Sequence, residues 1–185
     1  IDWVEIPEAD ASGRREFIYQ QNERRVEPTF WIARYPITYL QFHAFADAAD
    51  GFKNPAWKKG LAAFPNLPDQ QFEVWNRPRD NVTWYHAMAF GRWLTAKVLQ
   101  APDLLPPVLR RRRDVRITLP TEWQWEKAAR GWDGRSYPWG KVYVSGYANV
   151  DETEKKDGPH KLCQSSPVGM YPQGASPFGV LDLIG

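Results

Sequence analysis

The sequence predicts an α+β fold that is rich in loops, with two or three helices packed on small antiparallel sheets. Aromatic residues make up 15% of the 185 residues, which favours a core built from large rings. Sixteen prolines and thirteen glycines indicate many turns and much irregular chain. Short apolar runs alternate with capped helical patterns, and this combination is not typical of a helical bundle.

The centre of the predicted fold begins with an alternating apolar run at 115–119. Its larger side chains fall on one face of an extended segment, and the run stops at Pro120. The sequence therefore predicts a short central strand with Val115, Ile117 and Leu119 on its buried face.

A capped helix is predicted directly after this strand. Thr121 is a favourable N-cap residue, and Gln124 three positions later completes a capping box. Gly131 suits the left-handed conformation that ends many helices. The next segment, 137–140, reads Tyr-Pro-Trp-Gly, and its two aromatic residues predict a buried loop rather than a flexible one.

The first half of the chain shows the same pattern of short strands and capped helices. Segments 3–7 and 30–32 predict strands, the first at a sheet edge and followed by a polar stretch. Residues 38–50 have helical spacing of apolar residues, with a capping box from Thr38 and closure by Gly51.

A second long helix is predicted from Thr83, its N-cap, to about Val98. His86 lies in its first turn without a companion ligand, which favours a structural role over metal binding. The expected buried stripe consists of Trp84, Ala87, Gly91 and Leu94.

Two segments without a period connect these elements. Residues 52–81 are expected to form a long packed loop whose rings either anchor it or line a pocket: Trp57, Phe64, Phe72 and Trp75. Residues 100–114 contain the basic run Arg110–Arg113. This piece is expected to be a tolerated, solvated loop, with a surface for an acidic partner as the alternative.

Composition limits the functional classes. A net charge of +2 gives no global field that would argue for nucleic acid. The sequence contains no run of about 18 apolar residues, the length that would predict a membrane span. The single cysteine, Cys163, excludes an internal disulfide and is consistent with a reducing compartment such as the cytoplasm. No signal peptide is visible, and a chain that starts with Ile1 and ends on Gly185 is expected to be a fragment.

No catalytic residue can be nominated from spacing alone. The three histidines are far apart and lack metal-binding spacing, and no nucleophile elbow, Walker loop or dinucleotide fingerprint occurs. Glu122 and Glu126 lie one turn apart on the predicted central helix. They face either a pocket or, more commonly for such a pair, a partner such as Arg130 or a backbone amide.

Four blocks of sequence carry a family resemblance. LPTEWQWEKAARG, YPWG, the segment YANV at 147–150 and PVGMYPQGASPFGVLDLIG occur in the order and spacing of the formylglycine-generating-enzyme family. The chain resembles that family from about Glu27 to Gly185, which implies a variant of the C-type lectin fold. On this basis residues 1–26 are expected to be an edge strand with a polar lead-in. Residues 27–185 are then a family domain whose C-terminal part is missing.

The resemblance implies two redox metals that this chain does not match. Formylglycine-generating enzymes hold copper(I) with two cysteines, which come after the position of Gly185. Cys163 matches neither position and is expected to be a buried small hydrophobe. Relatives that use non-haem iron carry its ligands in a separate helical domain, which has no counterpart here.

Calcium is the cofactor that the resemblance does offer. In the family an Asn side chain and the next carbonyl bind calcium together with a later Asp, which here implies Asn149, the Val150 carbonyl and Asp157. Calcium prefers several oxygen ligands, and His160 stands near the place that the Asp should occupy. The alternative is that Asn149 only forms a turn.

Two functions from different classes follow from the resemblance. The first is a non-catalytic module that recognises a ligand or a protein, such as a sensor domain or a variable protein diversified by a retroelement, in bacteria often fused to a signalling module. The second is a copper-dependent oxidase that acts on a sulfatase cysteine, with its own cysteines beyond residue 185. A third option is a degenerate interaction domain. The first is preferred because the chain lacks the residues that catalysis would need.

Overall fold

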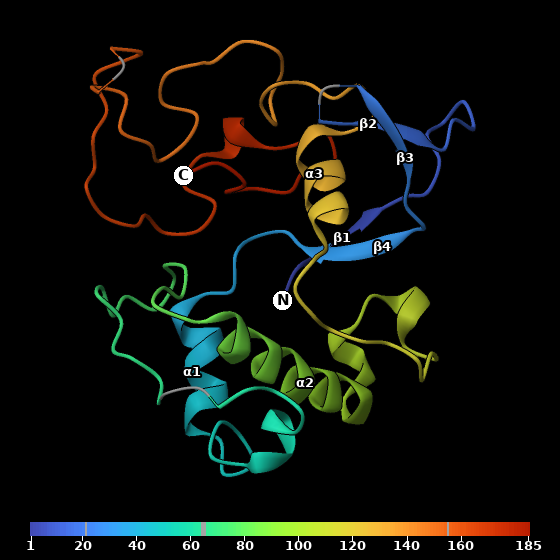
Figure 1. The fold of residues 1–185 in the computed structure, drawn as a ribbon, viewed down its shortest axis with the longest axis vertical. Coiled ribbons are helices and arrows are strands. Elements are labelled where there is room, and N and C mark those ends of the chain that lie inside the picture. The colour runs from blue at the N-terminus through green and yellow to red at the C-terminus, as the bar shows by residue number, and fades with distance from the viewer. Residues whose placement is uncertain (21, 64–65, 155) are drawn as a thin grey trace. The chain divides into compact units, whose positions relative to one another are not determined.

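A computed structural model describes residues 1–20, 22–63, 66–154 and 156–185. The chain divides into two compact units (Figure 1). Unit 1 consists of Ile1–Pro36 and Pro120–Gly185, and unit 2 consists of Ile37–Leu119. The expected boundary between residues 26 and 27 stays a prediction.

The N-terminal segment of unit 1 forms a small antiparallel sheet. Strand β1 (Trp3–Ile6) pairs with β4 (Phe30–Ala33), and both strands were predicted. Val4 and Ile6 alternate with more exposed neighbours along β1, so one face of the strand points to the core. They pack with Ala128 and Val180 in the hydrophobic core of this unit.

A second hairpin was not predicted. Strand β2 (Glu16–Tyr19) pairs with β3 (Glu23–Val26) inside the stretch that looked like a polar lead-in. β3 reads Glu-Arg-Arg-Val and has almost no buried face, so its sequence lacks the alternation that marks a strand. Phe17 is nearly fully buried and gives the hairpin its apolar side.

Helix α3 (Glu122–Arg130) packs beside β2 and begins and ends as predicted. The Thr121 hydroxyl accepts a hydrogen bond from the Gln124 amide, and the Gln124 side chain accepts one from the Thr121 amide. Gly131 follows the helix at a φ of 67°, a conformation that glycine adopts without a Cβ penalty. Over its described residues, the rest of unit 1 is loop apart from the short 3₁₀ helix η4 (Pro172–Gly174).

The prediction of a central strand at 115–119 is wrong. The segment has no regular secondary structure and pairs with none of the described strands. Instead the Ile117 amide donates to the Thr95 hydroxyl at 2.9 Å. The backbone of Ile117 also lies close to Gly91, because a Cβ on Gly91 would be 2.7 Å from the Ile117 carbonyl oxygen. The segment therefore packs on a helix, whose side chain supplies the hydrogen bond that a neighbouring strand would have supplied.

Unit 2 is built from two helices that lie side by side (Figure 1). Helix α1 (Tyr39–Asp47) begins at the predicted capping box of Thr38 and ends three residues earlier than predicted. Helix α2 (Trp84–Gln100) begins at Thr83. Short 3₁₀ helices η1 (Pro55–Lys58), η2 (Pro102–Leu104) and η3 (Pro107–Leu109) punctuate the connections.

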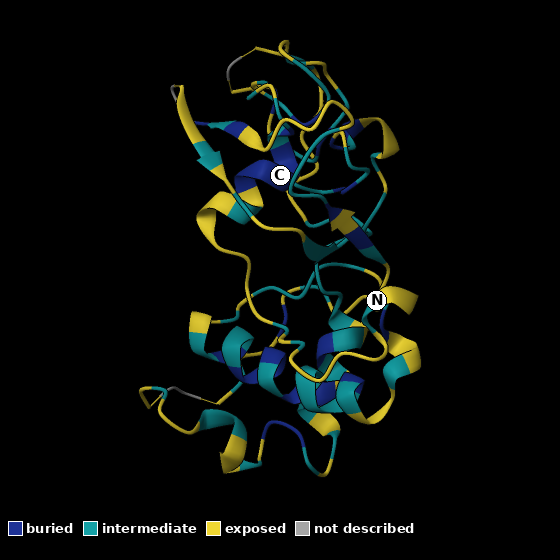
Figure 2. Ribbon diagram, turned by 90° about the vertical axis from the view of Figure 1, so that its right-hand side faces the viewer, coloured by how far each residue is buried: buried dark blue, intermediate teal, exposed yellow. Residues whose placement is uncertain are grey.

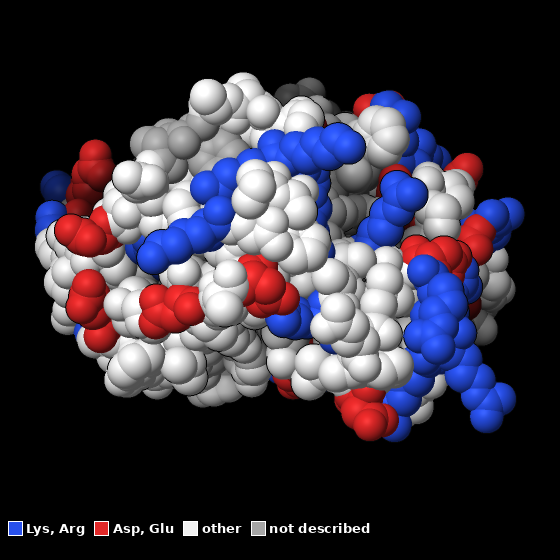
Figure 3. Space-filling view, turned by 90° about the horizontal axis from the view of Figure 1, so that it is seen from below, with Lys and Arg blue, Asp and Glu red and all other residues white. Residues whose placement is uncertain are grey.

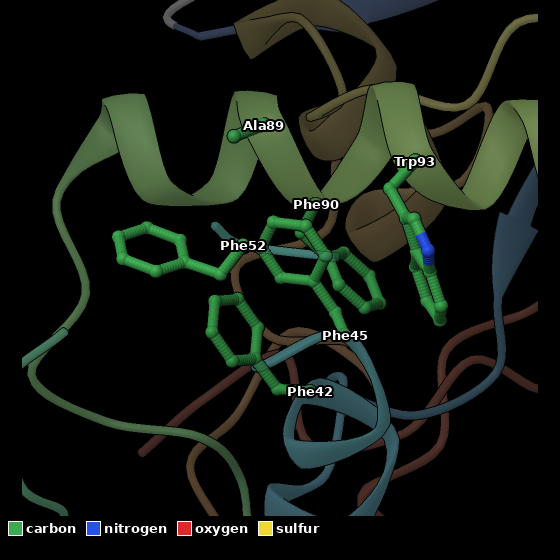
Figure 4. Packing of buried hydrophobic residues seen from close by; sticks show 6 residues of the cluster. All are labelled: Phe42, Phe45, Phe52, Ala89, Phe90 and Trp93. Atoms are coloured by element: carbon green, nitrogen blue, oxygen red, sulfur yellow. The ribbon is translucent and has the colours of Figure 1, made fainter. Parts of the chain in front are cut away.

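Aromatic rings fill the space between α1 and α2 (Figure 4). Phe45 is fully buried, and its ring centroid lies between 5.4 and 5.9 Å from the ring centroids of four neighbours. Most of these pairs are edge-to-face or tilted, which is the geometry that ring quadrupoles favour. The cluster consists of Phe42, Phe45, Phe52, Ala89, Phe90 and Trp93.

The buried side of α2 agrees with the predicted stripe in part, since Gly91 is buried and Leu94 packs against the aromatic cluster. Trp84 is 55% exposed, whereas Phe90 and Trp93 face the core (Figure 2 shows intermediate and buried residues along most of the helices of unit 2). His86 is fully buried, and its Nδ1 accepts a hydrogen bond from the Thr83 amide at 3.1 Å. The prediction that His86 is structural is confirmed.

The long loop at 52–81 anchors some of its rings and exposes others. Trp57 packs on the aromatic cluster and donates its indole N–H to the Asp50 carbonyl at 2.5 Å. Trp75 is 57% exposed. Phe64, also named as a candidate anchor, lies outside the described residues. In the basic run, Arg110 and Arg112 pair with Asp103 and Asp114, and a partner surface there stays a prediction.

Candidate functional site

The C-terminal loops of unit 1 have almost no regular structure and are organised by aromatic stacking. Tyr137 and Trp139 stack at 5.3 Å between ring centroids, and Tyr143 and Tyr147 pack edge-on against them. Pro138 is fully buried between the two stacked residues. The segment 137–140, predicted as a buried loop, is packed by these contacts, with Pro138 buried and both rings half-buried.

A buried carboxylate fastens two of these loop segments together. The Glu152 side chain accepts hydrogen bonds from the Tyr143 hydroxyl (2.5 Å), the Ser145 hydroxyl (2.7 Å) and the Gly146 amide (2.8 Å). A fourth bond comes from the His160 amide at 3.3 Å. Because Glu152 is only 1% exposed, these donors replace the water that its charge would otherwise need.

The chain approaches this carboxylate so closely that one position must be glycine. A Cβ on Gly158 would collide with the Glu152 carboxylate and with the Ser145 hydroxyl. The backbone also closes around the residue, because the Glu152 amide donates to the His160 carbonyl at 2.9 Å. Burial by itself would raise the pKa of Glu152, but the hydrogen bonds outweigh it and lower the pKa to about 2.

A groove of about 390 Å³ opens in the same loops, beginning three residues before Glu152. Its polar atoms come from side chains of both signs, since Lys161 and Asp151 form an ion pair at 2.7 Å between Nζ and Oδ2. The Asp151 carboxylate also accepts hydrogen bonds from Thr153, and both interactions lower its pKa. The lining residues are Asn149, Val150, Asp151, Lys161, Leu162, Cys163, Gln164, Ser165 and Gly185.

Two of the three residues implied for calcium lie in this groove. Asn149 and Val150 line it, and the Asn149 side-chain amide donates to the Gln164 carbonyl at 2.8 Å. Asp157 is not among the lining residues, and its amide donates to the Glu152 carbonyl at 3.0 Å. The calcium site stays a prediction.

The expectation that Cys163 is buried is wrong. Its side chain is exposed in the groove, and its backbone has a φ of 54°. A cysteine in a short apolar run is often a core residue, but here the run Leu162–Cys163 crosses an open groove wall instead of packing inside.

The carboxylates of α3 take the second of the two predicted roles. Glu126 is buried and pairs with Arg130, and it also accepts a hydrogen bond from the Gln20 amide at 2.6 Å. Glu122 accepts a hydrogen bond from the Tyr19 hydroxyl at 2.5 Å. Both side chains attach the helix to the β2–β3 hairpin, so they serve the fold.

The residues present do not fit a thiolate-bound copper site. The chain has a single cysteine, whereas such a site needs two thiolates. Over the described residues, no three His, Cys, Asp or Glu side chains come together in a way that could hold a metal ion.

Among the residues that the structure describes, no helix is long and apolar enough to cross a bilayer.

Comparison with known proteins decides the family. A model of the sulfatase-modifying factor enzyme 1-like domain matches residues 7–185. The chain belongs to this family. The family has the C-type-lectin-like fold, and the α+β architecture with small antiparallel sheets is confirmed. The match includes the β2–β3 hairpin that sequence reasoning missed.

Curated relatives in this family are longer than the chain. A hercynine oxygenase of Mycolicibacterium smegmatis is 27% identical over 183 residues, covering 85% of this chain and 36% of the relative. An uncharacterised protein of Bacillus subtilis, YfmG, is 26% identical over 85% of this chain and 32% of its own length. A formylglycine-generating enzyme of Mycobacterium tuberculosis is 40% identical over 73 residues, or 36% of this chain and 24% of the relative. The chain thus spans about a third of the relatives that it matches along most of its length.

Proposed function

We propose that this chain is a recognition module that binds a small polar ligand in the groove beside Glu152. The observation that carries the proposal is the groove itself. Its volume of about 390 Å³ falls within the ~300–1,000 Å³ range of small-molecule sites. Its wall carries amide groups and the ion pair of Lys161 with Asp151, and a zwitterion is the kind of ligand whose two charges can exchange with the two members of that pair.

Preorganised loops support this proposal. A loop that binds a ligand gains affinity when its conformation is fixed before binding, because less entropy is lost. The Glu152 network fixes the segments on either side of it, and the Asn149 amide joins the two walls of the groove through Gln164. Binding residues on loops that a rigid centre positions are common in proteins.

Hercynine is the first ligand to test, since it is a zwitterion and one of the relatives named above is a hercynine oxygenase. Thermal unfolding with and without hercynine should show a rise in Tm for the unsubstituted chain and a smaller rise for Lys161→Met. Lys141→Met is the matched control, because Lys141 is exposed in the same unit but does not line the groove. A panel of amino acids and betaines extends the test. The proposal fails if no ligand gives a larger rise in Tm for the unsubstituted chain than for Lys161→Met.

A calcium ion at the groove is a further part of this proposal. The Asn149 side chain and the Val150 carbonyl supply oxygen atoms of the kind that calcium prefers, and Asp157 would supply a carboxylate. Calorimetric titration with calcium should give binding that Asn149→Ala and Asp157→Asn both weaken. Loss in the first variant alone would remove Asp157 from the site.

An oxidoreductase is the second candidate, favoured by the names of the relatives. Hercynine oxygenase and formylglycine-generating enzyme are both enzymes, and the chain covers only part of each. In this candidate the chain supplies scaffold, and the redox metal is held by residues outside it. Titrations with copper(I) and iron(II) separate the two candidates when metal uptake is compared between the longest natural gene product and residues 1–185 alone. Stoichiometric metal uptake by the longer protein only would favour the enzyme.

A further inference from the structure

Unit 2 carries an aromatic surface that the proposed groove in unit 1 does not use. Three rings contact one another at the start of α1: Tyr39 and His43 stack at 5.2 Å between centroids, and Trp75 lies 5.9 Å from Tyr39 and 6.1 Å from His43. We call these residues the aromatic triad. Trp75 is 57% exposed, so more than half of the surface of this residue, which has the largest ring of the three, is open to solvent.

The backbone holds Trp75 in this position. The Leu40 amide donates to the Trp75 carbonyl at 3.1 Å, and the Tyr39 amide donates to the Arg77 carbonyl at 2.8 Å. These bonds tie the loop at 75–77 to the first turn of α1, where backbone amides have no partner within the helix. An exposed tryptophan on a segment fixed in this way suits binding, because little order has to be gained on contact.

A small cavity of about 200 Å³ lies beside the triad. Tyr39, His43 and Ala46 of α1 form one wall, and Leu67, Asp69 and Glu73 of the long loop contribute to the other. This volume is below the range of sites for drug-sized ligands, so it suits the end of one side chain rather than a cofactor.

The charge around the cavity is predominantly negative. Asp69 and Glu73 line it, and Asp47 is hydrogen-bonded to His43 at 2.9 Å. Among the ion pairs formed by described residues of unit 2, neither Asp69 nor Glu73 takes part. The pKa of the Tyr39 hydroxyl is raised, chiefly by burial. The nearby carboxylates raise it further, and Glu73 has the largest effect among them.

One cation, Arg79, also lines the cavity, but both of its terminal nitrogens already donate to the long loop. Its Nη2 donates to the Pro68 carbonyl at 2.5 Å, and its Nη1 donates to the Gln70 side chain at 3.2 Å. Its side chain is only 7% exposed, and its nearest carboxylate is that of Asp80 at 3.7 Å. Arg79 therefore supports the loop and leaves Asp69 and Glu73 available to a ligand.

We propose that the aromatic triad and the Asp69–Glu73 rim form a docking site for an arginine side chain on a basic segment of a partner protein. A guanidinium group stacks on an indole face and pairs with a carboxylate at the same time, which a compact ammonium does less well. The wider surface shown in Figure 3 mixes both signs of charge, so recognition here comes from this local arrangement and not from a global field. The proposal is independent of the groove in unit 1.

The probe for this site is the peptide acetyl-Gly-Arg-Gly-amide, titrated into the full 185-residue chain and followed by the indole N–H signals in NMR spectra. The Trp75 signal is assigned as the one that is missing in Trp75→Ala. We expect it to shift in a saturable way with the arginine peptide. The peptide with neutral citrulline in place of arginine should bind about tenfold more weakly, because stacking without charge loses the cation–π attraction.

Two variants test the residues. Trp75→Ala and the double variant Asp69→Asn, Glu73→Gln should each weaken binding about fivefold or more. Trp84→Ala and Asp103→Asn are matched controls, because Trp84 is 55% exposed and the Asp103 side chain is 94% exposed in the same unit. Circular dichroism confirms that each variant is folded. The proposal is overturned if no saturable shift occurs, if the citrulline peptide binds as well as the arginine peptide, or if either test variant keeps full affinity.

Discussion

The two units of this chain keep their loops in place by different physical means. Unit 2 packs a cluster of aromatic rings between two helices, and that cluster is almost entirely apolar. The described residues of unit 1 form small sheets, helix α3 and the short 3₁₀ helix η4, and its C-terminal loops converge on the carboxylate of Glu152. The hydrophobic effect has no direction and tolerates many loop paths, whereas a buried charge requires each donor at a fixed place. The stability of unit 1 should therefore depend on pH and on single polar atoms. The stability of unit 2 should depend on the volume of the side chains that fill its core.

The largest expected effect is on unit 2. Phe45→Ala removes a fully buried ring that contacts four others, and it should lower the free energy of unfolding by about 3–5 kcal/mol. Leu40→Ala, on the same helix and 52% exposed, should cost less than about 0.5 kcal/mol. Urea unfolding followed by tryptophan fluorescence measures both. Equal midpoints for the two variants would remove the aromatic cluster as the main support of unit 2.

Glu152→Gln is the corresponding change in unit 1. The amide group places an N–H₂ donor where the carboxylate accepts from other donors, so Tm should fall by about 5–10 °C. Glu154→Gln, an exposed carboxylate two residues away, should leave Tm unchanged. Differential scanning calorimetry gives both values.

The pH dependence of the same residue sharpens the contrast. The folded pKa of Glu152, about 2, lies below its ordinary value of 4.5. Its contribution to stability is therefore complete above pH 4.5 and is lost as the pH falls towards 2. The Tm difference between the unsubstituted chain and Glu152→Gln should shrink over this range, and a constant difference would contradict the assigned role.

Lys127 gives unit 1 a second dependence on pH, of the same sign but in the alkaline range. Its side chain is fully buried, donates to the Glu27 carbonyl at 3.2 Å, and lies 4.4 Å from the Trp132 ring centroid. Burial lowers its pKa from 10.5 to about 8. Between these values the unfolded chain binds more protons, so stability relative to Lys127→Met should rise with pH, by on the order of 2 kcal/mol. Chemical unfolding at pH 7.5, 9 and 10.5 tests this, and a flat difference would argue against burial of the charge.

The smallest expected effect concerns the helix capping box, which occurs in both units. Thr83→Ala in unit 2 and Thr121→Ala in unit 1 each remove the hydroxyl of a capping box. Each should cost about 1 kcal/mol, because the lost hydrogen bond is local. Urea unfolding should give similar values for the two variants. A difference of several kcal/mol would mean that one cap takes part in the tertiary support of its unit.

The sequence by itself determined the features that depend on neighbours in the chain. The caps at Thr38, Thr83 and Thr121, the glycine at 131 and the packed turn at 137–140 were predicted and are present. The family resemblance was also readable from sequence, since it rests on the order of short motifs. Each of these signals lies within a few residues, so its physics is local.

Only the tertiary structure decided which side chains are buried and what they contact. Glu152 looked like one charge among many, because its donors span positions 143–160 and form no periodic pattern. The 115–119 run had the alternation of a strand but found the side chain of Thr95 in place of a strand partner. Cys163 and Trp84 are exposed and Lys127 is buried, each against the usual preference of its residue type. Burial depends on contacts between distant segments, and those contacts fixed the groove, its carboxylate support and the aromatic triad.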